Sequence, residues 1–540
     1  MPKIRHEVHY GGRMVPAFAD RPAQIDAMFR GAVARDPAGI AVVDGKRRMS
    51  YAELDDTVDR VAGNLAELGV GKGDRLAILL GNRTAFVETC LACARLGAVQ
   101  VPINIRQRKP ENEYVLAHCG AVAAIYEADL APQIPDAKSV PAMRLRFAVG
   151  GAAPDAAPYE TLLQPAPPPP ALSIGEDEPF SILYTSGTTG RPKGAILTHF
   201  SVIHSCLNYQ YGMGLREGDR SILAVPASHV TGLVAIILSM IRINGCTIMM
   251  PAFKARTFLE LAAAERMTHS LIVPAMYNLC LLEPDFSRFD LAAWRVGGYG
   301  GAPMPEATIR RLAEELSGLT LFNVYGATET TSPVTMMPPG EGVAHIDTVG
   351  KILPCCDIRI MDDDGREVGP GQPGELWIAG AMVVPGYWDN PDANAANFTH
   401  GYWRSGDIGS IDTDGFVRVF DRKKDMINRA GYKVYSAEVE NVLTHHPIVV
   451  EAAVIGRPDP VLGEKVEAFI VAREAGASAA DIRAFCAERL SDYKVPDHVT
   501  FLSEPLPRNA NGKVLKGELR DRIAAESASS SIRSSQAGGA

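Results

Sequence analysis

Apolar residues recur with a helical period in the first part of the chain. Between residues 51 and 68 they step by four, three, four and three positions, which places them on one face of a helix. Ser50 and Glu53 form a capping-box pattern ahead of this run, and Gly69 follows it as a stop signal. The residues of the predicted apolar face are Leu54, Val58, Val61, Leu65 and Leu68.

Two shorter apolar runs flank a second helical segment. Residues 75–80 (RLAILL) and 98–103 (AVQVPI) are continuous enough to predict buried strands, and residues 84–96 predict the helix between them. A strand, a helix and a strand of these lengths require a right-handed crossover between parallel strands. The fold class indicated for this large N-terminal part is therefore layered α/β.

The pattern changes beyond about residue 360. Asp-Gly turns at residues 364–365 and 414–415 separate segments of alternating polarity, which predicts a subdomain rich in antiparallel β-hairpins. Beyond about residue 425, helices over 437–445 and from Ser478 onward alternate with the strands VVEAAVIG and KVEAFIVA. This order predicts a small α+β domain at the C-terminus. Residues 526–540 contain little apolar sequence, and we expect a disordered tail there.

Two segments without charge have structural interpretations. Four consecutive prolines in residues 164–170 (QPAPPPP) exclude a helix or a central strand, so this segment is expected to be a surface connector. Residues 221–241 contain no Asp, Glu, Lys or Arg, but Pro226, His229 and Gly232 interrupt them. We therefore expect a buried strand, loop and helix in this segment rather than a membrane span.

Composition narrows the class of function and the compartment. The 540 residues include 63 acidic and 54 basic side chains, a net charge of −9, and 46% hydrophobic residues, which is typical of a globular protein. A general nucleic-acid binder needs a basic field, so that class is disfavoured. Nine cysteines are too few for a disulfide scaffold. The N-terminal sequence lacks a signal-peptide pattern, and a cytoplasmic location is expected.

Two motif matches fail on their context. Residues 369–374 (GPGQPG) match the dinucleotide pattern GxGxxG, but their prolines and the following strand-like ELWIAG prevent a helix from beginning there. Cys90 and Cys93 form a CxxC on one face of a predicted helix, without a second pair of ligands nearby. We expect a hairpin loop and two buried small side chains, respectively.

The segment with the clearest chemistry is residues 184–194 (YTSGTTGRPKG). Within ten residues from Thr185 it provides four hydroxyls, three glycines and a lysine. Glycines let backbone N–H groups turn inward and hydroxyls add donors, so such a loop is suited to phosphate oxygens. The spacing of a Walker A loop is absent. The residues alone leave a phosphate-binding loop and a flexible polar loop both open.

This segment resembles the signature loop of the AMP-forming adenylate-forming superfamily, which includes acyl-CoA synthetases, peptide-synthetase adenylation domains and luciferases. The resemblance extends from about residue 25 to about residue 520, with further motifs in the family's order. It implies that the loop holds the β- and γ-phosphates of ATP. The matching residues are Thr185, Ser186, Gly187, Thr188, Thr189, Gly190 and Lys193.

Two further segments resemble the family's adenine and magnesium motifs. In residues 323–329 (NVYGATE) the resemblance implies that Tyr325 stacks on adenine, Thr328 contacts the α-phosphate and Glu329 holds Mg²⁺. Read alone, Glu329 would be an ordinary turn carboxylate, although a hard oxygen ligand is what Mg²⁺ needs. The other nucleotide-binding residues implied here are Gly301, Ala302, Pro303, Asn323 and Gly326.

Residues 403–407 (WRSGD) and 421–425 (DRKKD) resemble the family's ribose and linker motifs. The resemblance implies that Asp407 and Arg422 contact the ribose and that Lys424 is the hinge, a position where Asp is also common. Asp421 stands where the family often has glycine. Ser405 stands where threonine is commoner and keeps the hydroxyl.

Lys513, in the sequence NGK, resembles the family's catalytic lysine. Read alone, it would be a solvated lysine after a tight Asn-Gly turn. Gly431 resembles the residue that lines the channel for the attacking thiol. The resemblance implies an adenylation domain over residues 1–421, a hinge over 422–425 and a mobile C-terminal domain over 426–525.

The implied activity is that of an ATP-dependent acid–CoA ligase. With Mg²⁺, ATP and CoA, such an enzyme forms an acyl-AMP, releases pyrophosphate and passes the acyl group to CoA. His229 resembles a residue beside the acyl pocket, where the alternative is an ordinary core histidine. Residues 229–234 contain no acidic side chain for an ammonium group and no cation for a second carboxylate. We therefore expect an apolar monocarboxylate, either fatty, alicyclic or aromatic.

Three other functions stay open at this level. The enzyme could load the pantetheine of a carrier protein, it could be an inactive binder of nucleotide or acyl groups, or it could catalyse a luciferase-like oxidation. We expect small-molecule partners and neither nucleic acid nor a transmembrane segment. A lysine acetyltransferase acting on Lys513 is a further hypothesis, because loss of that charge would block acyl activation. A homo-oligomer is left open.

Overall fold

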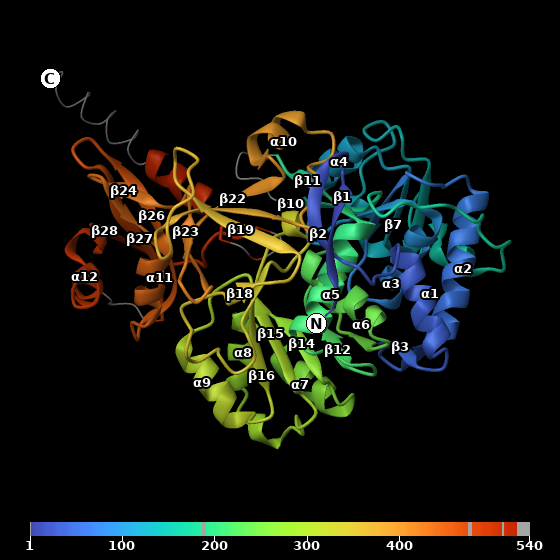
Figure 1. The fold of residues 1–540 in the computed structure, drawn as a ribbon, viewed down its shortest axis with the longest axis horizontal. Coiled ribbons are helices and arrows are strands. Elements are labelled where there is room, and N and C mark those ends of the chain that lie inside the picture. Colours follow the sequence, from blue (N-terminus) through green and yellow to red (C-terminus); the bar gives the residue numbers. More distant parts are fainter. Residues whose placement is uncertain (1, 186–190, 474–477, 510–511, 513, 526–540) are drawn as a thin grey trace. The chain divides into compact units, whose positions relative to one another are not determined.

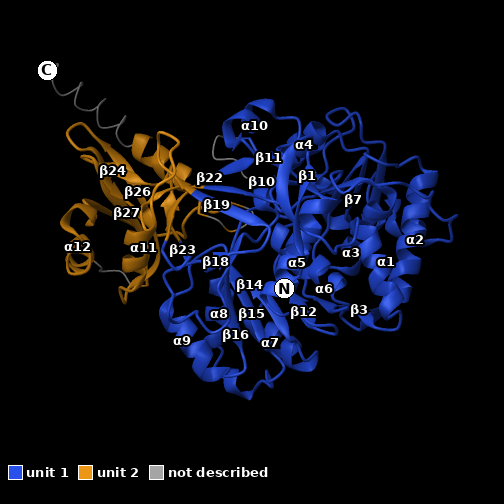
Figure 2. Cartoon of the chain, in the orientation of Figure 1, with its two compact units in different colours: residues 1–359, 377–404, 412–417 blue, residues 360–376, 405–411, 418–540 orange. Residues whose placement is uncertain are grey.

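The computed structural model describes residues 2–185, 191–473, 478–509, 512 and 514–525. The chain forms two compact units (Figure 2). Unit 1 comprises residues 1–359, 377–404 and 412–417, and unit 2 comprises 360–376, 405–411 and 418–540. The predicted tail over 526–540 lies outside the described residues. The domain boundary predicted at residue 421 stays a prediction.

The N-terminal half of unit 1 contains a seven-stranded sheet in the order β11-β10-β6-β5-β7-β8-β9 (Figure 1). All neighbours are parallel except the hairpin partners β10 and β11. The strands are β5 Arg75–Leu79, β6 Val99–Pro102, β7 Ala123–Glu127, β8 Leu145–Val149, β9 Ala157–Pro158, β10 Pro179–Thr185 and β11 Lys193–Thr198. The helices are α2 Tyr51–Glu67, α3 Thr84–Leu96 and α4 Lys109–Cys119. The predicted parallel crossover from β5 through α3 to β6 is confirmed.

Helix α2 shows how local chemistry sets the ends of an element. The Ser50 hydroxyl accepts a hydrogen bond from the Glu53 N–H, and the Glu53 carboxylate accepts one from the Ser50 N–H, so the predicted capping box is confirmed. Gly69 adopts a φ of +79°, which ends the helix. The predicted face is buried except at Leu68, which is 44% exposed because it is the C-cap residue, beyond the last helical turn.

The second sheet of unit 1 has nine strands in the order β18-β17-β16-β15-β14-β12-β13-β3-β4. From β16 to β3 every pair is parallel. The strands are β3 Ile40–Asp44, β4 Arg47–Ser50, β12 Arg220–Leu223, β13 Cys246–Met249, β14 His269–Ile272, β15 Val296–Gly300, β16 Thr320–Tyr325, β17 Thr335–Met336 and β18 Lys351–Ile352. The helices are α1 Ile25–Arg35, α5 His199–Gly212, α6 Ser239–Arg242, α7 Ala255–Ala264, α8 Pro274–Leu281 and α9 Glu306–Glu315.

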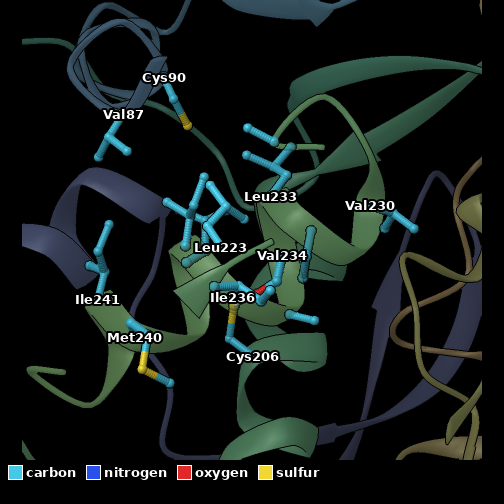
Figure 3. Close-up of a cluster of buried hydrophobic side chains, with 14 of the residues drawn as sticks. Val87, Cys90, Cys206, Leu223, Val230, Leu233, Val234, Ile236, Met240 and Ile241 are labelled. Atoms are coloured by element: carbon cyan, nitrogen blue, oxygen red, sulfur yellow. Dashed lines mark hydrogen bonds between the residues drawn. The ribbon is translucent and has the colours of Figure 1, made fainter. Parts of the chain in front are cut away.

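Residues 221–241 form the predicted strand, loop and helix, and the helix begins as a π-helix over Thr231–Leu238. Its residues from Gly232 onward are buried, and Figure 3 shows them packed with Val87 and Cys90 of α3 and Cys206 of α5. Within the described residues, no helix combines the length and apolar character needed to cross a membrane. Cys90 and Cys93 are buried as expected, and burial raises the pKa of the Cys90 thiol to about 12.

Unit 1 also contains the hairpin of β1 Ile4–His9 and β2 Arg13–Phe18 and the helix α10 Pro391–Asn397. A five-stranded sheet follows the order β19-β20-β22-β21, with β23 paired to β22, and strands β19, β20 and β22 carry residues of both units. Its strands are β19 Cys356–Met361, β20 Gly374–Gly380, β21 Phe398–Thr399, β22 Tyr402–Ile411 and β23 Val417–Arg422. Residues 369–373 form the predicted loop before β20, and no helix begins there.

The C-terminal part of unit 2 is the predicted α+β fold. Its sheet has the order β25-β24-β27-β26, with β28 paired to β27. The elements are β24 Ile427–Arg429, β25 Tyr432–Val434, α11 Ser436–Thr444, β26 Val449–Asp459, β27 Gly463–Ala472, α12 Ala479–Ala487 and β28 His498–Leu502. Residues 516–525 are helical. Val439, Leu443 and Ile482 are completely buried against this sheet and form the core of the unit.

Candidate active site

The hairpin of β10 and β11 holds the two ends of the glycine- and hydroxyl-rich segment together. Thr185 and Lys193 are direct cross-strand partners, and the Thr185 hydroxyl donates to the Lys193 carbonyl at 3.4 Å. A Cβ at Gly194 would lie 2.6 Å from the Ile182 side chain, so the hairpin needs glycine there. The remaining predicted phosphate ligands, Ser186, Gly187, Thr188, Thr189 and Gly190, lie outside the described residues.

Lys193, Tyr387 and Glu329 form a contiguous group beside this hairpin. The Lys193 ammonium lies 5.1 Å from the centre of the Tyr387 ring, and the Tyr387 hydroxyl donates to Glu329 Oε1 at 2.9 Å. Burial and the Glu329 charge raise the pKa of Tyr387 far above its usual value, so its hydroxyl stays protonated and donates. The structure thus connects the predicted site residues Lys193 and Glu329 through Tyr387, which was not predicted from the sequence.

The backbone around Tyr387 is fixed on both sides. The Trp388 N–H donates to the Gly194 carbonyl at 2.7 Å, and the Val384 N–H donates to the Glu329 carbonyl at 3.0 Å. The Asn394 side chain accepts from the Tyr387 N–H and donates to its carbonyl. A tyrosine after glycine is too common a pattern to have identified this residue from the sequence.

Glu329 and Thr328 lie on a 3₁₀ turn, Thr328–Thr330, that follows β16. The turn is followed by Thr331 and Ser332, both with a φ of +50°, which is uncommon for residues other than glycine. Helix α5 supports this backbone, because the Ser205 hydroxyl donates to the Ser332 carbonyl at 2.5 Å. The predicted phosphate and magnesium residues therefore occupy a constrained turn at the end of a parallel strand.

The segments predicted to bind adenine lie at the same edge of the nine-stranded sheet. Residues 301–303 follow the end of β15, and Tyr325 ends the neighbouring parallel strand β16. A Cβ at Gly300 would lie 2.3 Å from the Val324 carbonyl, so only glycine permits this approach of the strands. The carboxyl edge of a parallel sheet is where α/β folds bind ligands. Asn323 is buried, and its amide donates to the Thr348 carbonyl at 2.9 Å.

His229 follows β12, a third parallel strand that ends at this edge. Its loop is held by the buried Asn82, whose amide donates to the carbonyls of Leu223, Val225 and Met250 and accepts from the Ala227 N–H. A Cβ at Gly232 would lie 2.3 Å from the Pro226 carbonyl, so glycine is required where the π-helix meets the loop. Sequence reasoning found His229 and missed Asn82.

In unit 2 the predicted ribose residues are paired. Arg422 Nε lies 3.1 Å from Asp407 Oδ1, and Asp407 is 5% exposed. The Asp407 N–H donates to the Ser405 hydroxyl at 3.0 Å, so the serine at this position provides a hydroxyl acceptor. Burial lowers the pKa of Lys424, and the Lys424 carbonyl accepts a hydrogen bond from Arg520 at 3.2 Å.

The backbone at Gly431 and at Gly512 adopts positive φ angles. Gly431 has a φ of +89°, and its N–H donates to the Asn428 side chain at 3.0 Å. Lys513 lies outside the described residues. Of the predicted Asn-Gly turn before it, Gly512 is described. It has a φ of +80° and donates its N–H to the Asn509 carbonyl at 2.9 Å.

The donor chemistry at Glu329 fits Mg²⁺. One carboxylate oxygen accepts from a neutral hydroxyl, and a carboxylate has lone pairs for further ligands. Among the described residues, a cluster of possible ligand atoms occurs elsewhere, at Glu7, His9 and Glu176. The Arg21 guanidinium bridges both glutamates at 2.7 Å, so this cluster is an ion-pair network.

Glycine-dependent contacts at Gly232 and Gly300 lie along one edge of the nine-stranded sheet. The β10–β11 hairpin carries Lys193, and Tyr387 connects this lysine to Glu329 on the turn after β16. The family model of AMP-binding enzymes matches residues 29–388, and that of the AMP-binding enzyme C-terminal domain matches residues 438–513. The chain therefore belongs to the AMP-binding enzyme family.

Similarity to curated relatives indicates which reaction within this family the chain catalyses. The chain is 37% identical over 488 residues to a feruloyl-CoA synthase of an Amycolatopsis species, which covers 90% of this chain and 96% of that protein. It is 36% identical over 485 residues to the long-chain-fatty-acid–CoA ligase FadD13 of Mycobacterium tuberculosis, over 88% and 94% of the two chains. The chain is thus an AMP-forming acid–CoA ligase.

A solved structure supports the fold. The anthranilate CoA ligase AuaEII in complex with anthranoyl-AMP superposes with a TM-score of 0.87 and 25% identity, over 94% of this chain and 99% of that one. The α/β architecture with a large N-terminal part and a smaller C-terminal domain is confirmed. The roles of individual site residues stay predictions.

Proposed function

We propose that this enzyme activates an apolar monocarboxylic acid as an acyl-adenylate and then transfers the acyl group to CoA. The observation that carries the substrate class is the segment after His229. Leu233, Val234 and Ile236 are completely buried, and no charged side chain occurs between residues 221 and 241. A substrate ammonium or a second carboxylate would have no counter-charge from this segment.

The first half-reaction joins two anions. The acid carboxylate attacks the α-phosphorus of ATP, a P–O bond forms, and the bond to pyrophosphate breaks. Such a step depends on positioning and charge neutralisation more than on covalent help. Lys193 provides a positive charge beside the phosphate loop, and Glu329 would hold the Mg²⁺ that accompanies ATP. Lys513 is proposed to bridge the carboxylate and the α-phosphate.

The second half-reaction transfers the acyl group. The CoA thiolate attacks the acyl carbon, a C–S bond forms, and AMP leaves. Asp407 and Arg422 are proposed to hold the ribose, and Gly431, which has no side chain, allows close approach of the thiol. A rotation at Lys424 would replace Lys513 by this segment between the two steps.

The proposal is tested by acid-dependent pyrophosphate release over a panel of acids. Apolar monocarboxylates of aliphatic, alicyclic and aromatic type should support release and yield CoA thioesters. Glu329→Gln should reduce both, because it removes the carboxylate charge. A preference for amino acids or dicarboxylates would contradict the substrate class. If the enzyme formed a thioester on a carrier protein and none on CoA, the proposal that CoA is the acyl acceptor would be contradicted.

A regulatory role and a location also belong to this proposal. Acetylation of Lys513 by a lysine acetyltransferase would remove the charge needed for adenylation, and thioester formation from supplied acyl-AMP should continue. Normal pyrophosphate release by acetylated enzyme would refute this. All nine cysteines are free thiols, which supports a reducing compartment such as the cytoplasm.

A further inference from the structure

Asp421 is a buried carboxylate that closes a loop within unit 2. It is 9% exposed and accepts three hydrogen bonds. Oδ1 accepts from the Arg422 N–H at 2.7 Å, and Oδ2 accepts from the N–H and hydroxyl of Ser436 at 2.5 and 2.7 Å. The segment between Asp421 and Ser436 contains Arg422, Lys424 and Gly431, which are three of the predicted site residues.

Ser436 extends this contact to the end of the chain that carries the predicted catalytic lysine. The Lys516 ammonium donates to the Ser436 hydroxyl at 2.6 Å and pairs with Glu440 Oε1 at 2.7 Å. The hydroxyl therefore donates to Asp421 and accepts from Lys516, as its chemistry permits. Lys516 begins the helical segment 516–525, three residues after Lys513.

Arg422 extends the same contact to the ribose pair. Its backbone N–H is fixed by Asp421, and its guanidinium lies 3.1 Å from Asp407. Removing a carboxylate from water is unfavourable unless hydrogen bonds replace the lost solvation. The three hydrogen bonds to Asp421 supply that replacement, and the Lys516 ammonium, which binds the Ser436 hydroxyl, adds a nearby positive charge. These contacts thus fix the backbone at Arg422 and the start of the helical segment 516–525 relative to the Asp421 carboxylate.

We propose that Asp421 is a positioning residue for acyl adenylation. It holds Arg422 for the ribose and, through Ser436 and Lys516, holds the helical segment that begins three residues after Lys513. This inference rests on the proposed function, which assigns roles to Arg422 and Lys513.

The test compares Asp421→Asn with Ser436→Ala, their double variant and a matched control. The control is Asp459→Asn, which removes a carboxylate that accepts from the N–H groups of Val461 and Leu462 and pairs with Lys465 at 2.6 Å. Each full-length enzyme is assayed for acid-dependent ATP–pyrophosphate exchange, for thioester formation from supplied acyl-AMP and CoA, and for thermal unfolding.

Asp421→Asn should slow the exchange by about ten-fold or more, as expected when a contact behind an active-site group is lost. Thioester formation from acyl-AMP should also fall, because Arg422 contacts the ribose in both steps. Its fall should be at least about five-fold smaller than the fall in exchange, because Lys513 acts only in the first step. Ser436→Ala should act in the same direction, and the double variant should be no slower than Asp421→Asn alone. The control should match the wild type.

Exchange at the wild-type rate in Asp421→Asn and Ser436→Ala would overturn the inference. An equal fall in both half-reactions, in proportion to lost folded protein, would also overturn it. A wild-type enzyme without acid-dependent exchange would instead contradict the proposed function itself.

Discussion

Replacing Tyr387 by phenylalanine isolates one hydrogen bond beside the predicted phosphate and magnesium residues. The change removes the hydroxyl that donates to Glu329 Oε1 at 2.9 Å. It keeps the ring, whose centre lies 5.1 Å from the Lys193 ammonium. Tyr387 is 3% exposed, so water does not readily replace the lost donor. The effect should therefore fall on the orientation of Glu329.

A hydrogen bond to a charged group contributes about 1.5–3 kcal/mol. If that energy maintains Glu329 in the geometry needed in the transition state, its loss lowers kcat/KM by about 10- to 150-fold. The assay is acid-dependent ATP–pyrophosphate exchange at several magnesium concentrations. Tyr387→Phe should need more Mg²⁺ for half-maximal exchange, because the carboxylate is less well oriented.

The matched control is Tyr402→Phe, since the Tyr402 hydroxyl also donates to a carboxylate of unit 1, that of Asp357. This control should keep wild-type exchange and wild-type dependence on Mg²⁺. If Tyr387→Phe stayed within about two-fold of the wild type at every magnesium concentration, the role assigned to the Tyr387–Glu329 contact would be refuted.

Three further predictions concern the scaffold. Gly232→Ala places a Cβ about 2.3 Å from the Pro226 carbonyl, so it should lower the thermal midpoint and weaken acid-dependent exchange; an unchanged midpoint would contradict the packing. Asn82→Ala leaves three buried carbonyls without their donor and should destabilise the enzyme by at least about 2 kcal/mol in denaturant unfolding, and a loss below about 0.5 kcal/mol would argue against it. Burial lowers the pKa of His269 to about 4, below the ordinary value near 6.5, so its contribution to stability is present above pH 6.5 and is lost as the pH falls toward 4. His269→Gln should reduce the pH dependence of the free energy of unfolding in that window by up to about 1.4 kcal/mol per pH unit, and an unaltered dependence would exclude His269 as its source.

Elements set by neighbouring residues were predictable from the sequence. Helix α2 is determined by its capping box and apolar repeat, and α3 has the bounds that its pattern predicts. The prediction was wrong at Leu68 because a repeat of apolar residues does not show where the last turn ends. The π-helix over Thr231–Leu238 was not predicted, since a completely apolar run carries no period.

Contacts between distant residues were not predictable in the same way. Tyr387 and Glu329 are 58 residues apart, and Asn82 and Ala227 are 145 apart. No local pattern links such residues, because their contacts arise only when the fold brings loops from different sheets together. The resemblance predicted site residues that lie in family motifs. The structure added side chains outside those motifs, such as Tyr387 and Asn82, that hold the motif segments in place.

The most direct test of the account is competition within a pooled library of carboxylic acids, with ATP, Mg²⁺ and CoA, analysed by mass spectrometry. The wild-type enzyme should form AMP and thioesters of apolar monocarboxylates. Lys513→Ala should reduce acyl-AMP formation by about 10²–10³-fold, by analogy with loss of a transition-state donor, and should still convert supplied acyl-AMP. Products dominated by amino acids or dicarboxylates, or adenylation that proceeds normally without the Lys513 ammonium, would contradict the account.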